Sequence, residues 1–339
     1  MASAQSSAPP SGVEIVGSGS AIPEKRLTNA DLERVMDTSD EWIVQRTGIH
    51  ERRVIDHERE TLGAYALEAG QKALADAGMA PTDIDMVMVA TMTPDMPTPG
   101  IASVLTHQLG MGTIGAMDLN AACSGFVYGM NFANAAIQSG MARNILLVGA
   151  DAITRHIDYS TYGRGAAILF GDAAGAVVVR ATDRSGPGLL AQAMHSDGGG
   201  AEVLYVPCMP HHIPEEQGQD DRKITKVQMN GQAVFRFAVK TFPQLIEETL
   251  EMVGLGADDV QHYVCHQSNR RILQAARDRF GLAEDKLHVN IGELGNTVAA
   301  SVPLVFDELR RAGRVEPGHR VMFLGFGAGL TWGSSLWQI

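Results

Sequence analysis

Helical periodicity alternates with short apolar runs along most of the chain. Residues 61–78 carry apolar side chains at helical spacing and end at Gly78, which predicts an amphipathic helix. The apolar run at 86–92 predicts a buried strand, and a further strand is expected at 144–151. Such alternation of helices and strands is typical of α/β proteins with largely parallel sheets.

The second half of the chain repeats this order. It predicts a helix over 234–254, a strand over 262–267 and a short strand over 287–291. The spacers agree as well, since GMAPTDIDMVMVAT resembles GLGADDVQHYVCHQ. An internal duplication is therefore expected, with two similar α/β layers packed together.

The duplication divides the chain. We expect a disordered leader at 1–12, a first half at 13–185 and a second half at 186–339. The leader has neither a basic segment nor an apolar core, so it does not read as a secretory signal.

Composition narrows the class of protein. The chain has 339 residues, of which 45% are apolar and 19% charged, and its net charge is −12. Acidic charge disfavours nucleic acid as a partner, and no apolar run reaches the roughly 18 residues of a membrane helix. Three cysteines cannot build a disulfide framework, which favours a reducing, cytoplasmic location. No metal-binding pattern such as paired C-x-x-C is present, so no metal is expected.

Superposing the halves would bring three polar residues together. Cys123 and Asn296 would begin equivalent helices, and His266 would end a strand equivalent to the one ending near Thr91. Strand ends and helix starts at the carboxyl edge of an α/β sheet are where sites form. The repeat therefore predicts that Cys123, His266 and Asn296 converge.

Each of these residues has two interpretations. Cys123, in DLNAACSGF, is either a small packing residue or a thiol whose pKa a helix start lowers. His266 is either a satisfied histidine at a strand end or a hydrogen-bond donor or proton carrier. Asn296 is either a helix cap or a neutral donor that stabilises an oxyanion.

Other motifs indicate an anionic ligand. Trp42 and Arg46 lie four residues apart, which would place them on one helical turn as an aromatic platform with a cation beside it. An amphipathic helix with a buried Trp explains the same spacing. Asn269, Arg270 and Arg271 form a basic cluster directly after His266. The glycine-rich GFGAGLTWGSS lacks the Lys-Ser/Thr ending of a phosphate loop and predicts a tight turn between two strands.

The segments DTSDEWI, RTGI, AACSGF, HQSNRRI, GNTVAAS and GFGAGLTWGSSL, in this order, resemble the β-ketoacyl-acyl carrier protein synthase III family. The resemblance extends over nearly the whole chain from about Gly12. It implies a duplicated thiolase fold with five layers, α-β-α-β-α. It also implies decarboxylative Claisen condensation of an acyl-CoA primer with malonyl-acyl carrier protein, which initiates fatty acid synthesis.

The resemblance assigns roles to residues. Cys123 accepts the acyl group, and His266 and Asn296 hold the malonyl thioester carbonyl. The backbone N–H groups of Cys123 and Ala328 hold the oxyanion on the acyl group. Coenzyme A would contact Trp42, Arg46, Arg164, Asn269 and Arg271.

The resemblance also implies partners. The family forms homodimers in which a loop like TPDMPTPG reaches the partner's acyl pocket. Thr98 of that loop stands where many relatives have a bulky aromatic residue, so strict selectivity for acetyl is not implied. An acidic carrier protein needs a basic dock, for which we expect Arg236, Arg270, Arg271 and Arg277. No cofactor, nucleic acid or membrane insertion is expected.

Several rivals share parts of this pattern. Hydroxymethylglutaryl-CoA synthase needs a carboxylate at the position where this chain has Met92 and Thr93, which argues against that enzyme. Type III polyketide synthases also use Cys, His and Asn, but DEWIVQRTGI favours synthase III. A non-catalytic partner of a condensing complex usually loses the nucleophile, and a cysteine hydrolase fits the duplication poorly. A synthase III-like ketosynthase or acyltransferase of specialised metabolism stays open as the alternative.

Overall fold

The computed structural model describes residues 10–184, 186–218 and 220–339. Residues 1–9 of the predicted leader and the predicted boundary at Ser185 lie outside the described residues. The first strand already begins at Gly12, so the predicted leader 1–12 extends one residue too far.

The first sheet has five strands in the order β1-β7-β6-β4-β5. They are β1 (Gly12–Ala21), β7 (Ala173–Thr182), β6 (Asn144–Asp151), β4 (Met86–Ala90) and β5 (Gly115–Leu119). β7 runs antiparallel to both β1 and β6, whereas β6, β4 and β5 are parallel. Apart from β5, these strands are apolar and largely buried, as expected for a sheet covered on both faces.

The second sheet repeats the same topology in the order β8-β13-β12-β11. Its strands are β8 (Gly188–Ser196), β13 (Thr331–Gln338), β12 (Arg320–Gly327) and β11 (His262–Cys265). β13 is antiparallel to both neighbours, and β11 is parallel to β12. The pairing pattern therefore matches that of β1, β7, β6 and β4, as the predicted duplication requires.

The predicted strand at 287–291 is wrong in length. Only one bridge forms there, between Leu287 and Tyr263, at the position that β5 occupies in the first sheet. A side chain replaces the ladder, because the Gln267 amide binds the backbone groups: its Nε2 donates to the His288 carbonyl at 3.2 Å, and its Oε1 accepts the Asn290 N–H at 3.1 Å. The chain then enters the short helix α9 (Ile291–Leu294).

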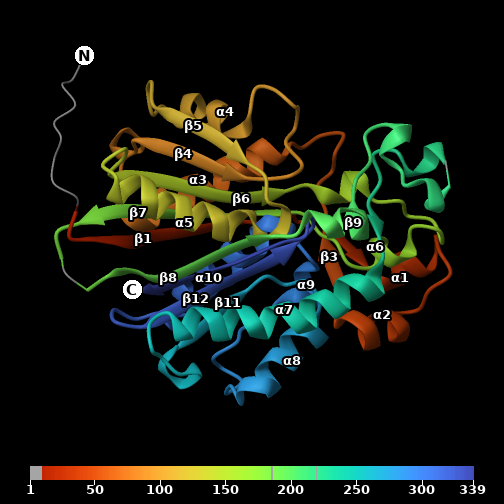
Figure 1. Ribbon diagram of the computed structural model, residues 1–339. Helices are drawn as coiled ribbons and strands as arrows, with labels where there is room; N and C mark the ends of the chain where they lie inside the picture. The colour runs from red at the N-terminus through yellow and green to blue at the C-terminus, as the bar shows by residue number, and fades with distance from the viewer. Residues whose placement is uncertain (1–9, 185, 219) are drawn as a thin grey trace.

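Helices complete a five-layered fold (Figure 1). α3 (Leu62–Ala77) and α4 (Ile101–Gln108) cover the outer face of the first sheet, and α5 (Gly125–Gln138) and α10 (Ser301–Arg311) pack between the sheets. α7 (Gly231–Glu251) and α8 (Arg270–Phe280) cover the outer face of the second sheet. The thiolase-type layering that the resemblance implied is therefore confirmed.

Helix boundaries follow local caps. α3 confirms the helix predicted over 61–78, since the Thr61 side chain accepts the Ala64 N–H and Gly78 ends the helix with φ 62°. α7 begins three residues before the predicted Val234, because Asn230 caps it by accepting the Ala233 N–H at 3.1 Å.

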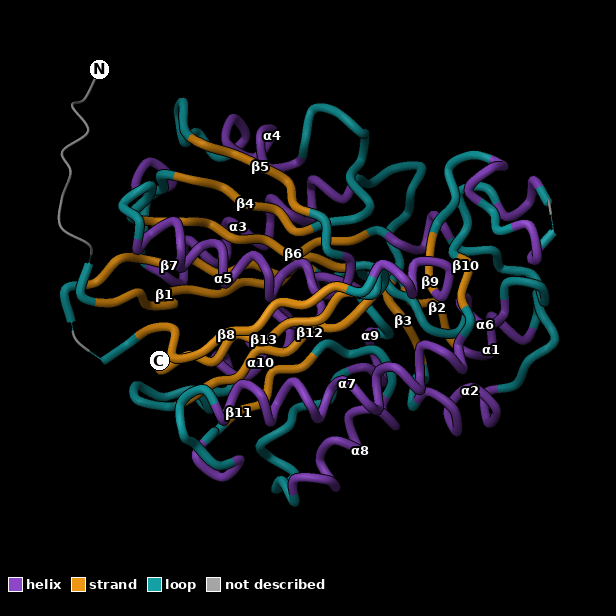
Figure 2. Tube along the Cα trace, viewed as in Figure 1, coloured by secondary structure: helices purple, strands orange, loops and turns teal. Residues whose placement is uncertain are grey.

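The short helices and strands that are inserted between the strands of the two sheets lie at one end of both sheets, on the right in Figures 1 and 2. Their elements are β2 (Arg26–Thr28), α1 (Asn29–Glu33), α2 (Asp40–Thr47), β3 (Glu51–Arg53), α6 (Arg164–Ala167), β9 (Leu204–Tyr205) and β10 (Gln228–Met229). The parallel strands β4 and β6 also end on this side, so the insertions cap the edge where sites form in α/β sheets. Among the described residues, no helix combines the length and apolarity needed to cross a membrane.

Candidate active site

Cys123 lies in a short 3-10 turn, Ala122–Ser124, that leads directly into α5. Ala122 adopts a left-handed backbone with φ 46°, which a residue with a Cβ rarely does. The Asn120 side-chain oxygen accepts the Ala122 N–H at 3.1 Å and so supports this conformation. Cys123 is only 4% exposed, and the turn holds it at the helix start that the sequence predicted.

The second half builds the same turn around Asn296. Val298 has φ 52°, and the Asn296 side-chain oxygen accepts its N–H at 2.9 Å. The counterpart of Asn296 is thus Asn120, and the counterpart of Cys123 is Ala299, so the expected equivalence of Cys123 with Asn296 is wrong by three residues. The bond to Val298 uses the Asn296 amide oxygen and leaves the Nδ2 amide as a donor.

The Asn296 backbone is locked onto the first half. Its N–H donates to the Leu169 carbonyl at 2.8 Å, and its carbonyl accepts the Gly171 N–H at 3.0 Å. Gly295 permits this approach: it has φ 69°, and a Cβ there would lie 2.7 Å from the Leu169 oxygen. The donor amide is therefore positioned by residues from both halves.

The pKa of Cys123 differs from expectation. Burial raises the pKa of the thiol to about 12, with the Asp151 carboxylate adding in the same direction, and the residue's own N–H opposes both. The expectation of a lowered pKa is contradicted, because desolvation of a buried thiolate outweighs the helix start. The resting residue is a neutral thiol that must lose its proton as it reacts.

This protonation state predicts the pH dependence of Cys123 alkylation. Below a raised pKa, the thiolate fraction grows about tenfold per pH unit, so the iodoacetamide rate at Cys123 should rise steeply between about pH 7 and 9. Quantitative peptide mapping measures this rate, with the exposed Cys208 as the reference in the same sample. A rate at Cys123 that stays flat over this range would contradict the neutral resting thiol.

His266 directly follows β11 and is 1% exposed. Its Nδ1 lies 2.6 Å from the Ser301 Oγ, and the Phe326 ring packs against it edge-on at 5.5 Å between centroids. Burial lowers the pKa of His266 from 6.5 to about 3, although a backbone contact with Val298 opposes the shift. The imidazole is thus neutral at physiological pH, which makes it a poor base and leaves it one N–H to donate.

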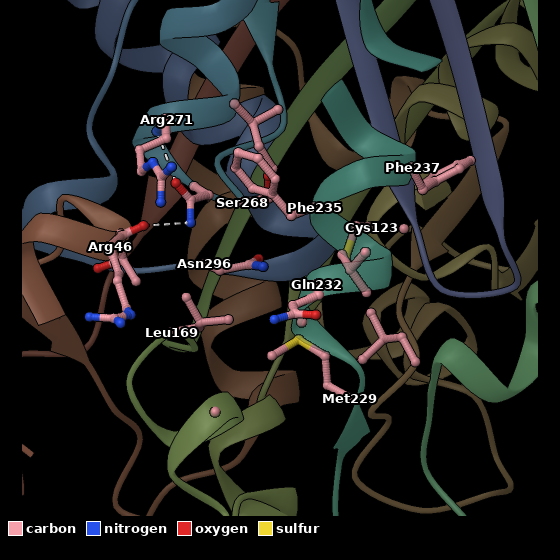
Figure 3. A pocket seen from close by; sticks show the side chains of 18 of the residues that line it. Arg46, Cys123, Leu169, Met229, Gln232, Phe235, Phe237, Ser268, Arg271 and Asn296 are labelled. Atoms are coloured by element: carbon pink, nitrogen blue, oxygen red, sulfur yellow. Dashed lines mark hydrogen bonds between the residues drawn. The ribbon is translucent and has the colours of Figure 1, made fainter. Parts of the chain in front are cut away.

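Cys123, His266 and Asn296 line one cavity of about 630 Å³. Figure 3 shows Cys123 and Asn296 in its wall. The cavity extends from Cys123 outward to Trp42 and Arg46. Its wall includes Gln232 and Phe235 from the first turns of α7, which sequence reasoning missed. Their i, i+3 spacing is a helical signal, but the later predicted start at Val234 concealed it.

The outer end of the cavity carries the predicted cation–aromatic group. Trp42 and Arg46 lie on α2, with the Arg46 guanidinium 4.2 Å from the centroid of the indole. Arg164, from the start of α6, approaches the same ring at 4.8 Å. Two cations close to one indole ring suit a flat, anionic ligand.

Asn269 and Arg271 connect this end to α8. The Asn269 side chain accepts the Arg271 N–H at 2.9 Å and donates to the Arg46 carbonyl at 3.0 Å (Figure 3). Asn269 thus joins α8 to α2 through the protein's own hydrogen bonds. The Arg271 guanidinium lies over the Phe235 ring at 5.1 Å and lines the cavity.

The four arginines of the predicted dock are divided between two surfaces. Arg236 and Arg271 line the main cavity, whereas Arg270 and Arg277 line a separate groove on α8. Arg277 also lies 3.5 Å from the Glu284 carboxylate, which offsets part of its charge. The structure therefore does not bring all four arginines to the cavity mouth.

The glycine-rich segment forms the predicted tight turn, between β12 and β13. Gly327 lies against the nucleophile, since a Cβ there would be 2.8 Å from the Cys123 Cβ and 3.2 Å from its sulfur. The left-handed conformation falls on Gly329, at φ 135°, and not on Ala328. Alanine at 328 is therefore accommodated without a positive φ.

A second, small cavity adjoins Cys123. It has a volume of about 30 Å³ and is almost wholly apolar, with Met92, Ile153 and Val206 in its wall. Asp151, at the end of β6, accepts the Met92 N–H at 2.9 Å and the Ala299 N–H at 3.1 Å, and so ties this wall to the Asn296 turn. Burial raises the pKa of Asp151 to about 6. No three His, Cys, Asp or Glu side chains cluster as a metal site within the described ranges.

The duplicated five-layered fold, with cysteine, histidine and asparagine in one cavity, defines a condensing enzyme of the thiolase-fold class. Comparisons specify the family. Residues 117–198 match the family described as 3-Oxoacyl-[acyl-carrier-protein (ACP)] synthase III, and 250–339 match its C-terminal part. Beta-ketoacyl-[acyl-carrier-protein] synthase III of Caldanaerobacter subterraneus is 43% identical over 322 residues, which cover 95% of this chain and 96% of the relative. The chain belongs to the β-ketoacyl-acyl carrier protein synthase III family and is an acyltransferase.

Solved structures agree with this assignment. The 3-oxoacyl-[acyl-carrier-protein] synthase III of Aquifex aeolicus has a TM-score of 0.88 at 36% identity, covering 97% of this chain and 100% of the other. The priming β-ketosynthase of the R1128 polyketide biosynthetic pathway has a TM-score of 0.89 at 33% identity, covering 99% and 98%. The fold is thus shared by a 3-oxoacyl-[acyl-carrier-protein] synthase III and by the priming β-ketosynthase of a polyketide biosynthetic pathway.

Proposed function

We propose that the protein condenses an acyl-CoA primer with malonyl-acyl carrier protein and initiates fatty acid synthesis. The products are 3-oxoacyl-acyl carrier protein, CO₂ and free coenzyme A. The observation that carries this proposal is the single cavity that contains Cys123, His266 and Asn296 and opens toward Trp42.

In the first step the Cys123 sulfur attacks the primer thioester carbonyl and loses its proton. The new oxyanion accepts hydrogen bonds from the backbone N–H groups of Cys123 and Ala328. Collapse of this intermediate breaks the C–S bond to coenzyme A, whose sulfur takes up a proton. The acyl group then remains on Cys123.

In the second step the malonyl thioester carbonyl accepts hydrogen bonds from His266 and Asn296. Loss of CO₂ places an electron pair on the α-carbon as an enolate, whose oxygen the two donors stabilise. The α-carbon attacks the acyl–Cys123 carbonyl, the new C–C bond forms, and the Cys123 thiolate leaves and takes up a proton. No metal or organic cofactor takes part in either step.

Coenzyme A would bind at the outer end of the cavity. The indole of Trp42 offers a stacking face for adenine, and the cations Arg46 and Arg164 beside it offer partners for phosphates. Arg271 is placed along the route of the pantetheine arm. Asn269 contributes by holding α8 against α2.

The primer that fits best is short. The apolar cavity of about 30 Å³ beside Cys123 matches a few carbon atoms and offers no polar partner. We therefore take acetyl-CoA as the first primer to test. Free, reduced cysteines and the carrier-protein substrate favour a cytoplasmic location.

The carrier dock predicts a salt-dependent effect. Reversing the charge of Arg270 and Arg277 together should raise the apparent KM for malonyl-acyl carrier protein several-fold, with little effect on malonyl-CoA, because the carrier is acidic. The increase should shrink as salt rises. Steady-state kinetics with both substrates measures it, and Arg236→Glu tests the main-cavity surface in the same way.

Arg143→Glu is the matched control for the dock. Arg143 is exposed and lies at the start of β6, at the opposite end of the sheet from the site. If the apparent KM rises equally for malonyl-CoA and for the carrier substrate, or rises equally in Arg143→Glu, then Arg270 and Arg277 do not bind the carrier protein.

The edge strand β5 supports a homodimer. Its outer side has no strand partner in the described fold, and Met117 on it is 43% exposed. Phe132 and Met96 are also about half exposed, and Thr98 lies on the same surface loop as Met96. Pairing of two β5 strands would cover these side chains.

Met117→Lys should then shift the protein from dimer to monomer in sedimentation velocity, and a parent protein that is monomeric would contradict this.

Priming of a specialised pathway is the second candidate, favoured by the similarity to the R1128 priming β-ketosynthase. Its chemistry at Cys123 is the same, and only the carrier protein differs. Parallel assays with a fatty acid carrier and a polyketide carrier distinguish the two, since the fatty acid role predicts faster turnover with the former.

A further inference from the structure

The two halves align around the site with one constant offset. The offset that pairs Cys123 with Ala299 also pairs Asp151, the last residue of β6, with Gly327, the last residue of β12. The register of the neighbouring strands agrees, since β6 pairs with β4 as β12 pairs with β11. Asp151 and Gly327 therefore occupy equivalent places beside the two turns.

The packing of the two turns confirms this equivalence. A Cβ at Gly149 would lie 2.5 Å from the Ala299 carbonyl oxygen, and a Cβ at its counterpart Gly325 would lie 3.3 Å from the Cys123 carbonyl oxygen. Each turn thus packs against a glycine two residues before the strand end. The strand ends themselves differ, because one carries a carboxylate and the other has no side chain.

The Asp151 carboxylate is completely buried, and only donors contact it. Its Oδ2 accepts the Ala299 N–H at 3.1 Å, and its Oδ1 accepts the Met92 N–H at 2.9 Å. The Thr91 and Thr93 hydroxyls donate to Oδ1 at 3.2 and 2.8 Å. Burial raises the pKa of Asp151 to about 6, and the hydrogen bonds oppose this shift, so the group is an anion at neutral pH.

At the Cys123 turn the same place is left to the substrate. A Cβ at Gly327 would lie 2.9 Å from the Cys123 nitrogen and 3.2 Å from its sulfur, so a side chain would crowd this N–H. In the proposed mechanism the oxyanion on the acyl group binds this N–H. The Ala299 N–H of the other turn instead binds an anion that belongs to the protein.

We propose that Asp151 is a positioning residue whose carboxylate fills, at the Asn296 turn, the place that the substrate oxyanion takes at the Cys123 turn. The Asn296 oxygen holds the Val298 N–H and Asp151 holds the next N–H along the chain, so together they fix the turn that carries the Nδ2 donor. This inference rests on the proposed function, because the oxyanion at Cys123 belongs to it.

The charge of Asp151 also acts on the nucleophile. Burial raises the pKa of Cys123 most, and the Asp151 carboxylate raises it further. A carboxamide at 151 would have nearly the same shape without the charge, and it would offer a donor where the carboxylate offers an acceptor. The reactivity of the thiol therefore reports the charge of Asp151 separately from its packing.

Asp151→Asn tests both effects. Its amide would turn a donor toward the Ala299 N–H or the Met92 N–H, so malonyl decarboxylation should fall about 10- to 100-fold, as expected when a group is displaced by up to about 1 Å. Alkylation of Cys123 by iodoacetamide at about pH 7.5 should rise about tenfold, as for a pKa lowered by about one unit. The fully buried Cys265 should stay unmodified, which shows that the variant is folded.

Asp307→Asn is the matched control. Asp307 is also buried, accepts the Ser18 hydroxyl at 2.8 Å and lies in the second half of α10. Its variant should change neither rate. Unchanged decarboxylation in folded Asp151→Asn, or the same changes in Asp307→Asn, would overturn the proposal. Slower decarboxylation without faster alkylation of Cys123 would also overturn it, because packing alone would then explain the loss.

If Asp151→Asn does not fold, Thr93→Ser and Thr93→Val decide. Both variants keep the charge, but only serine keeps the hydroxyl that donates to Asp151. Slower decarboxylation in the valine variant alone supports the proposal, and equal rates in the two variants overturn it. Decarboxylation that survives in His266→Ala would instead contradict the proposed function, while alkylation of Cys123 would still report the charge of Asp151.

Discussion

Removing either enolate donor should stop decarboxylation and spare acylation. His266→Ala and Asn296→Ala are each expected to slow malonyl decarboxylation by about 10²–10³-fold, the usual cost of one oxyanion donor in a buried site. Acylation of Cys123 should continue, because a neutral imidazole with a pKa near 3 is a poor base for the thiol. Release of ¹⁴CO₂ from labelled malonyl thioester and acyl-protein mass separate the two steps.

Asn296→Asp sharpens this test. Aspartate keeps an oxygen for the Val298 N–H, which holds the left-handed turn, but it removes the Nδ2 donor. Asn120→Ala is the matched comparison in the first half, since it removes the same kind of bond, to Ala122, beside the nucleophile. It should slow acylation more than decarboxylation. Near-parental decarboxylation in both Asn296→Asp and His266→Ala would refute the donor roles.

Loss of the nucleophile should have the largest effect. Cys123→Ala is expected to lower condensation by more than about 10³-fold, because no other cysteine is among the described residues that line the cavity. Decarboxylation of malonyl thioester should persist, since His266 and Asn296 are untouched. The assay follows 3-oxoacyl product and CO₂ separately, so that uncoupling of the two is visible.

Cys208→Ala serves as the control for Cys123→Ala. Cys208 is exposed and lies outside both cavities that contain Cys123. Its variant should condense at the parental rate. Condensation that survives in Cys123→Ala, or that is lost in Cys208→Ala, would remove Cys123 from the mechanism.

The sequence was most informative where one local pattern determines structure. The apolar periodicity of 61–78 with its flanking Thr61 and Gly78 specified α3 to within one residue at each end. The repeated order of helices and strands likewise anticipated two sheets of matching topology. These features depend on spacing and caps, which a single sequence displays.

Features that depend on contacts between distant segments were not predictable. The 287–291 segment has strand-like composition, but the side chain of Gln267, just after β11, binds the His288 carbonyl and the Asn290 N–H that a ladder would use. The raised pKa of Cys123 arises from burial between the two halves, which no local motif reports.

In the candidate site, too, the residues that a motif marks were predictable, and those that depend on distant contacts were not. The motifs predicted Cys123, His266 and Asn296, and these three residues do line one cavity. Ser301 and Asp151 were missed because their contacts with His266 and the Ala299 N–H exist only after folding. The asparagine at the end of β5, Asn120, could have been recognised as the counterpart of Asn296 from the similar segments NAACS and NTVAAS.

A pulse-chase experiment tests the central claim most directly. The protein is incubated with [1-¹⁴C]acetyl-CoA, freed of excess label, mapped by peptide mass, and then chased with malonyl-acyl carrier protein. We predict that the label resides on the peptide containing Cys123 and moves, with release of CO₂, into 3-oxobutanoyl-acyl carrier protein. Label on Cys208 or Cys265, or label on Cys123 that the carrier substrate does not remove, would contradict condensation through an acyl–Cys123 intermediate.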